Sequence, residues 1–201
     1  MNYQGVAYQI TKKFPNIYLI DLVPSSFWFS YGSNLCKADF EEKMKKRGSR
    51  LSLLNPIVFR LREWKRILSN ESATRGLAYT IVPGNDTDFV DGIIHEIPER
   101  ELEAFLSFEG VWNNQELLGT PKRRYDIMKI AIPGGNNVLL TLVGRQVVSN
   151  EQQRNQLIRT HKQKIDDYVR TVIRGAVDFG IDPGPFLNDL RWIEDLTNRT
   201  M

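Results

Sequence analysis

One acidic residue stands where it could exchange protons with a substrate. Glu109 follows Leu102, Phe105 and Leu106 at helical spacing, so a helix that buries this apolar stripe would turn the Glu109 carboxylate inward. Burial and the negative end of the helix both disfavour the charged form, and we therefore expect the pKa of Glu109 to be raised. Such a carboxyl group is suited to general acid–base catalysis. The alternative is a helix that frays before Gly110 and leaves Glu109 in water.

A second stretch could bind an anion. The apolar run Phe27-Trp28-Phe29 leads through Ser30 into Tyr31-Gly32-Ser33-Asn34-Leu35, and a helical pattern follows. A short buried strand that ends in such a turn and opens a helix leaves several backbone N–H groups without partners. These donors form a cradle for a carboxylate or a phosphate. The alternative is an ordinary loop, because Gly-Ser-Asn is common in loops.

Three other side chains are weaker candidates for chemistry. Ser33 lacks the Gly-x-Ser-x-Gly context of a nucleophile elbow. Cys36 is the single cysteine and lies near a helix start, where a thiol pKa can be lowered, although a buried structural cysteine is the more frequent case. His95 lies within an alternating strand pattern and is expected to be structural. One cysteine and two histidines argue against a dedicated zinc site, and we predict no metal and no cofactor.

The composition is that of an ordinary globular protein. The 201 residues suit one domain, and the net charge is only +3. The basic runs 43–47 and 122–124 could contact nucleic acid, but no nucleic-acid motif accompanies them, so we interpret them as solvated faces and predict no nucleic-acid partner. The apolar run 17–20 is too short to span a bilayer, and no signal-peptide pattern is present. With a single cysteine, these features predict a cytoplasmic protein without a membrane partner.

Periodicity predicts strands in runs with few helices between them. The turn signal at 83–86 suggests that strand 89–95 pairs with strand 76–82, and residues 69–75 are expected to form a polar loop. Such an order indicates an α+β fold with a small mixed, β-barrel-like sheet, flanking helices and a helical C-terminal segment. The remaining expected strands cover 51–67, 125–132 and 138–143, and the expected helices cover 37–47, 98–109, 151–179 and 185–196.

The same pattern suggests three parts of the chain. We expect an N-terminal extension over residues 1–26, a core over 27–148 and a C-terminal helical segment of the same domain over 149–201. Residues 1–26 alternate in hydropathy but offer no role.

Two ordered motifs resemble a known family. Phe29-Ser30-Tyr31-Gly32-Ser33-Asn34-Leu35, followed by Leu106-Ser107-Phe108-Glu109-Gly110, resembles the γ-glutamylcyclotransferase family, in which a hydrophobic strand and Tyr-Gly-Ser-Asn precede a Leu-x-x-x-Glu-Gly helix end. Tyr125 resembles the tyrosine that the family places after its glutamate, and Tyr168 resembles the tyrosine of its terminal helix. Residues 78–82, followed by 90–94, also resemble the family's paired strands, and the resemblance covers roughly residues 27 to 198.

The resemblance implies an enzyme. It implies a small α+β barrel-like domain that cyclises a γ-glutamyl amino acid or γ-glutamyl amine to 5-oxoproline and releases the amine. Glu109 would be the general acid and base, and the turn Tyr31, Gly32, Ser33, Asn34 and Leu35 would hold the glutamyl group together with Tyr125 and Tyr168. The substrate's own α-amine is the nucleophile, so neither a cofactor nor attack by Ser33 is required.

The sequence departs from the family in several places. The loop 111–124 is long and carries Trp112, so it bears on the choice of leaving group. Residues 139–142 read Leu-Leu-Thr-Leu where some members have a tyrosine. Residues 1–26 have no counterpart, and the glutathione-specific branch reads Tyr-Gly-Ser-Leu instead of Tyr-Gly-Ser-Asn. The expected partner is a small γ-glutamyl substrate, and the sequence leaves a homodimer open. A non-catalytic module that binds a γ-glutamyl-like or anionic molecule is the alternative function.

Overall fold

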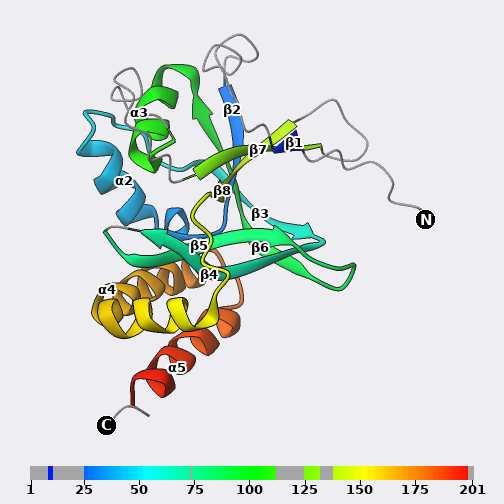
Figure 1. Cartoon of the computed structure of the whole chain (residues 1–201). Helices are drawn as coiled ribbons and strands as arrows, with labels where there is room; N and C mark the ends of the chain where they lie inside the picture. Colours follow the sequence, from blue (N-terminus) through cyan, green and yellow to red (C-terminus); the bar gives the residue numbers. More distant parts are fainter. Residues whose placement is uncertain (1–8, 11–24, 73, 112–124, 132–137, 199–201) are drawn as a thin grey trace.

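The computed structural model describes residues 9–10, 25–72, 74–111, 125–131 and 138–198. Along the described residues, three runs of strands are separated by two helices, and two long helices follow the last run (Figure 1). The elements are β1 (Gln9–Ile10), β2 (Ser25–Ser30), the 3-10 turn η1 (Ser33–Leu35), α2 (Lys37–Lys45), β3 (Leu54–Arg62), β4 (Trp64–Ser72), β5 (Gly76–Pro83), β6 (Phe89–Pro98), α3 (Glu99–Glu109), β7 (Tyr125–Ala131), β8 (Val138–Gly144), α4 (Glu151–Asp178) and α5 (Gly184–Asn198).

The predicted α+β class with a mixed sheet is confirmed. Six strands form one sheet in the order β1-β7-β8-β2-β6-β3, in which β2 runs parallel to β8 and the other pairs are antiparallel. Trp28 and Phe29 of β2 are both buried, although they point to opposite faces, as expected for a central strand covered on both sides. Since β1 and β3 are edge strands, the sheet formed by the described residues is not a closed barrel.

The remaining two strands correct the predicted pairing. Strand β5 pairs with β4 and not with β6, which lies between β2 and β3. Strand β4 runs on to Ser72, so residues 69–72 are strand and not the expected loop. Their polar side chains suggested exposure, but Ser69 and Asn70 are buried. Their burial is possible because residues 146–148 satisfy their hydrogen bonds. Ser69 Oγ donates to the Val148 carbonyl at 2.6 Å, and Asn70 Oδ1 accepts from the Gln146 amide at 3.1 Å.

The helices form two groups on the sheets. Figure 1 shows α4 beneath the β4–β5 pair with α5 packed against α4, whereas α2 and α3 lie together beside β2. On α4, Ile165, Val169, Val172 and Ala176 are buried, and this stripe contacts β5 and η1. Helix α4 therefore packs against the turn that follows β2.

Two predicted segments fall largely outside this description. Residues 1–8 and 11–24 of the predicted N-terminal extension, and residues 112–124 of the predicted long loop, lie outside the described residues. Among the described helices, none is both long enough and apolar enough to cross a membrane.

Candidate active site

A cavity of about 420 Å³ opens where the end of β2, the turn η1, the end of α3 and the helix α4 meet. Seven of the eight residues predicted to form the site line it, and Gly32 contributes its backbone to the wall. Leu35 does not line it: its side chain is completely buried and anchors the turn from below. The predicted site residues at the cavity are Tyr31, Gly32, Ser33, Asn34, Glu109, Tyr125 and Tyr168.

The turn at the end of β2 has the geometry of an anion cradle. The backbone hydrogen bonds that close it run from the Leu35 amide to the Gly32 carbonyl and from the Cys36 amide to the Ser33 carbonyl. The amides of Ser33 and Asn34, which open the turn, therefore have no acceptor within it. Gly175 of α4 permits this arrangement, because a Cβ at that position would lie 2.3 Å from the Leu35 carbonyl carbon and the Cys36 nitrogen.

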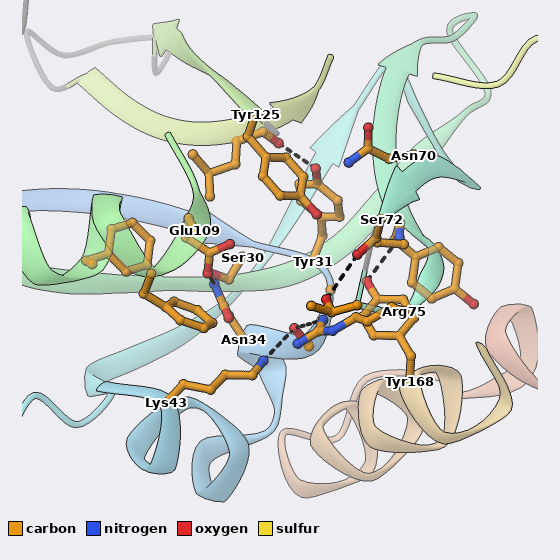
Figure 2. A pocket seen from close by; sticks show the side chains of 18 of the residues that line it. Ser30, Tyr31, Asn34, Lys43, Asn70, Ser72, Arg75, Glu109, Tyr125 and Tyr168 are labelled. Carbon is orange, nitrogen blue, oxygen red and sulfur yellow. Dashed lines mark hydrogen bonds between the residues drawn. The ribbon is translucent and has the colours of Figure 1, made fainter. Parts of the chain in front are cut away.

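Glu109 lies at the last position of α3, directly above this turn. Leu102, Phe105 and Leu106 are buried as the stripe predicted, and Gly110 ends the helix in the left-handed region at φ 70°. The Glu109 carboxylate accepts a hydrogen bond of 2.7 Å from the Asn34 side-chain amide, and it is half-buried (Figure 2). The helix thus does not fray before Gly110. The raised pKa of Glu109 stays a prediction.

Three tyrosines supply neutral hydroxyl groups to the cavity. Burial is the main cause that raises the pKa of Tyr31, Tyr125 and Tyr168, so all three stay protonated at neutral pH. The Tyr31 hydroxyl donates to the Leu142 carbonyl, and the Tyr168 hydroxyl accepts from the Tyr79 amide at 3.0 Å. Leu142 lines the same cavity.

Two cations at the cavity were missed by the sequence reasoning. Lys43 Nζ and an Arg75 guanidinium nitrogen both donate to Ser33 Oγ, at 3.2 and 2.8 Å. Burial is the main cause that lowers the pKa of Lys43, and the Arg75 charge lowers it further, while Asp39 and Glu109 act in the opposite direction. The sequence predicts a solvated face for the run 43–47, and for Lys43 this prediction is wrong, because its side chain is largely buried. Phe40 and Met44 are buried on α2, and this spacing turns Lys43 toward Ser33.

A buried serine–histidine pair forms part of the wall. Ser30 lines the cavity, and its Oγ lies 2.9 Å from His95 Nε2. Burial lowers the pKa of His95 to about 4, so the ring is neutral at physiological pH. Its Nδ1 has no hydrogen-bond partner in the described part of the chain, so the carboxylate of a catalytic triad is missing. The structural role predicted for His95 agrees with this geometry. Cys36 is buried at the start of α2 and does not line the cavity.

Comparisons with known proteins address the fold. No protein-family model and no curated protein matches this sequence. Among solved structures, a gamma-glutamyl cyclotransferase matches with a TM-score of 0.50 and 20% identity over 86% of both chains. The chain has the fold of a gamma-glutamyl cyclotransferase.

Two other solved structures share this fold. The uncharacterized protein loc79017 from Homo sapiens matches with a TM-score of 0.50 and 20% identity over 87% of both chains. YkqA from Bacillus subtilis matches with a TM-score of 0.54 and 18% identity, over 86% of this chain and 55% of its own. At these identities the likeness concerns the gamma-glutamyl cyclotransferase fold and not the residues that act within it.

Proposed function

We propose that this protein is a γ-glutamyl cyclotransferase, which converts a γ-glutamyl amino acid or γ-glutamyl amine to 5-oxoproline and releases the attached amine. The observation that carries the proposal is the 2.7 Å hydrogen bond between Asn34 and Glu109 inside the cavity. It joins the expected proton-transfer group to the turn that would hold the substrate.

Glu109 is the group that moves protons in this scheme. Its carboxylate takes a proton from the α-ammonium of the substrate, and the resulting amine attacks the γ-carbonyl carbon to form the new ring C–N bond. The protonated Glu109 then gives its proton to the departing nitrogen, and the C–N bond to the leaving amine breaks. The Glu109 carboxylate takes the second proton from the ring nitrogen, which becomes the lactam N–H, and passes it to the released amine, which leaves as an ammonium ion. Protons balance over the cycle, and one positioned carboxyl group performs every transfer.

The turn and the tyrosines bind and fold the substrate. The amides of Ser33 and Asn34 are donors for the glutamyl group, with one near the γ-carbonyl oxygen, where negative charge develops. Tyr125 and Tyr168 contribute neutral hydroxyls and ring faces to the same cavity. Because the nucleophile and the carbonyl belong to one molecule, holding them in a bent conformation supplies much of the acceleration.

Binding without catalysis is the second candidate function, and one observation favours it. Lys43 and Arg75 meet at Ser33, and such a pair of cations would retain an anionic small molecule whether or not it reacts. In that case the Asn34–Glu109 contact would be a structural hydrogen bond.

One assay distinguishes the enzyme from the non-catalytic binding module. The purified chain is incubated with a panel of γ-glutamyl amino acids and γ-glutamyl amines, and 5-oxoproline is measured by mass spectrometry. We expect release from at least one compound. A rise in melting temperature with a compound that yields no 5-oxoproline, together with no turnover across the panel, would support the binding module and contradict the enzyme.

A further inference from the structure

The two cations at Ser33 are not needed for the proton transfers proposed for Glu109. They come from separate elements, since Lys43 lies on α2 and Arg75 lies just before β5, and both donate to the same hydroxyl oxygen (Figure 2). Lys43 Nζ also lies 5.0 Å from the centre of the Phe108 ring, and the Arg75 guanidinium lies 4.7 Å from the centre of the Tyr168 ring. Aromatic faces and a hydroxyl group thus hold both cations at the cavity wall.

The two cations differ in their carboxylate partners. Lys43 pairs with the Asp39 carboxylate on its own helix. Within the described part of the chain, no ion pair joins Arg75 to a carboxylate, and its partners are the neutral Ser33 hydroxyl and the Tyr168 ring. Two like charges on one neutral oxygen repel each other, and a bound anion would relieve this repulsion. An arginine in this setting is suited to a carboxylate, which it can bind with two parallel hydrogen bonds.

Arg75 also lies where the cavity continues. A second hollow of about 260 Å³ shares Ser33, Thr74, Arg75 and Tyr168 with the first. A substrate whose glutamyl end lies on the turn beside Glu109 would therefore extend its leaving group past Arg75.

We propose that Arg75 and Lys43 bind a carboxylate on the leaving amine, so that the substrates are γ-glutamyl amino acids or γ-glutamyl peptides and not γ-glutamyl derivatives of neutral amines. This inference rests on the proposed function. One of the turn amides of Ser33 and Asn34 is assigned to the glutamyl α-carboxylate and the other to the γ-carbonyl oxygen, and the second carboxylate is assigned to the two cations.

The test compares two substrates that differ only in that carboxylate: γ-glutamyl-alanine and γ-glutamyl-alaninamide. The readout is the ratio of their kcat/KM values for 5-oxoproline release. We expect the wild-type chain to prefer γ-glutamyl-alanine, and Arg75→Gln to lower the ratio about 10- to 100-fold, the range for a hydrogen bond between charged groups. Lys43→Gln should lower the ratio in the same direction. Lys45→Gln is the matched control, because Lys45 is exposed on the same helix and does not line the cavity; its ratio should equal that of the wild type.

The results of this comparison distinguish a failure of the inference from a failure of the proposed function. If Arg75→Gln and Lys43→Gln slow both substrates equally, the two cations do not bind the carboxylate of the leaving amine. The inference is then wrong, whereas the cyclotransferase activity is unaffected by this result. An unchanged ratio in two folded variants also contradicts it. If one of the two variants does not fold, the ratio measured for the other variant tests the inference. If the wild type releases 5-oxoproline from no γ-glutamyl compound, the proposed function fails and the inference fails with it.

Discussion

At the scale of single residues, the function that we propose depends on the contact between Asn34 and Glu109. A neutral amide donor at 2.7 Å favours the charged carboxylate, whereas partial burial disfavours it. Asn34 is itself buried, so its side chain has little freedom to leave this contact. We infer that Asn34 positions Glu109 relative to the turn.

Replacing the amide by a second carboxyl group should change the pH dependence of the reaction. In Asn34→Asp, two carboxyl groups would face each other at hydrogen-bond distance, and their repulsion raises the pKa of one ionisation. Since a general base acts in its deprotonated form, the acidic limb of the kcat/KM profile should move to higher pH. The measurement is the pH profile of 5-oxoproline release, with the uncharged Asn34→Leu as control. An acidic limb at the same pH in Asn34→Asp and wild type would contradict a direct role for this contact.

At the scale of elements, the packing of α4 against η1 fixes the shape of the turn. The backbone of Leu35 and Cys36 lies directly on Gly175, closer than any side chain there would allow. A Cβ built on Gly32 would lie 3.0 Å from the Tyr168 hydroxyl, so the same helix limits the turn from a second side. The cradle therefore depends on Tyr168 and Gly175, which lie more than 130 residues after the turn in the sequence.

Adding one methyl group at this contact should destabilise the fold. In Gly175→Ala the new Cβ would meet backbone atoms at 2.3 Å, so α4 or the turn must shift, at a cost of about 1–3 kcal/mol. The midpoint of urea unfolding should fall accordingly. Val177→Ala is the control, because Val177 is exposed on the same helix and its truncation should stay within about 0.5 kcal/mol. Equal midpoints for the two variants would show that the helix does not constrain the turn as we describe.

At the scale of the whole molecule, one buried histidine links the central strands to the helices. His95 of β6 contacts Ser30 of β2, and its ring packs edge-on against Phe40 of α2 and Phe105 of α3. An imidazole in this position is stable only as the neutral form.

This burial should make the protein sensitive to mild acid. The pKa of His95 is lowered to about 4 in the folded chain, whereas an exposed histidine has a pKa of about 6.5. The unfolded chain therefore binds the proton first, and the free energy of unfolding should fall by about 3 kcal/mol between pH 6.5 and pH 4. Well above pH 6.5 the histidine is neutral in both the folded and the unfolded chain, and its burial then causes no loss of stability.

Urea unfolding at several pH values measures this contribution. His95→Gln should lack it, so the difference in unfolding free energy between wild type and variant should shrink as the pH falls from 6.5 to 4. His161→Gln changes the only other histidine and should keep the wild-type dependence. A constant difference between wild type and His95→Gln over this range would contradict the assignment.

The sequence predicted local features better than distant ones. The apolar stripe of α3, the turn after β2 and Gly110 as the end of the helix follow from spacing and backbone preference, which act over a few residues. The strand at 69–72 was missed because its buried polar side chains are satisfied only by residues 146–148. Arg75 and Lys43 were missed because nothing local shows that two elements bring them to Ser33.

Replacing the carboxyl group of Glu109 by an amide tests the central claim most directly. Glu109→Gln keeps the size of the side chain but cannot exchange protons as a carboxyl group does, so kcat/KM for 5-oxoproline release should fall about 10²- to 10⁴-fold while the melting temperature changes little. Glu103→Gln, which changes an exposed carboxylate on the same helix, should match the wild type. A folded Glu109→Gln variant that releases 5-oxoproline as fast as the wild type would contradict the account.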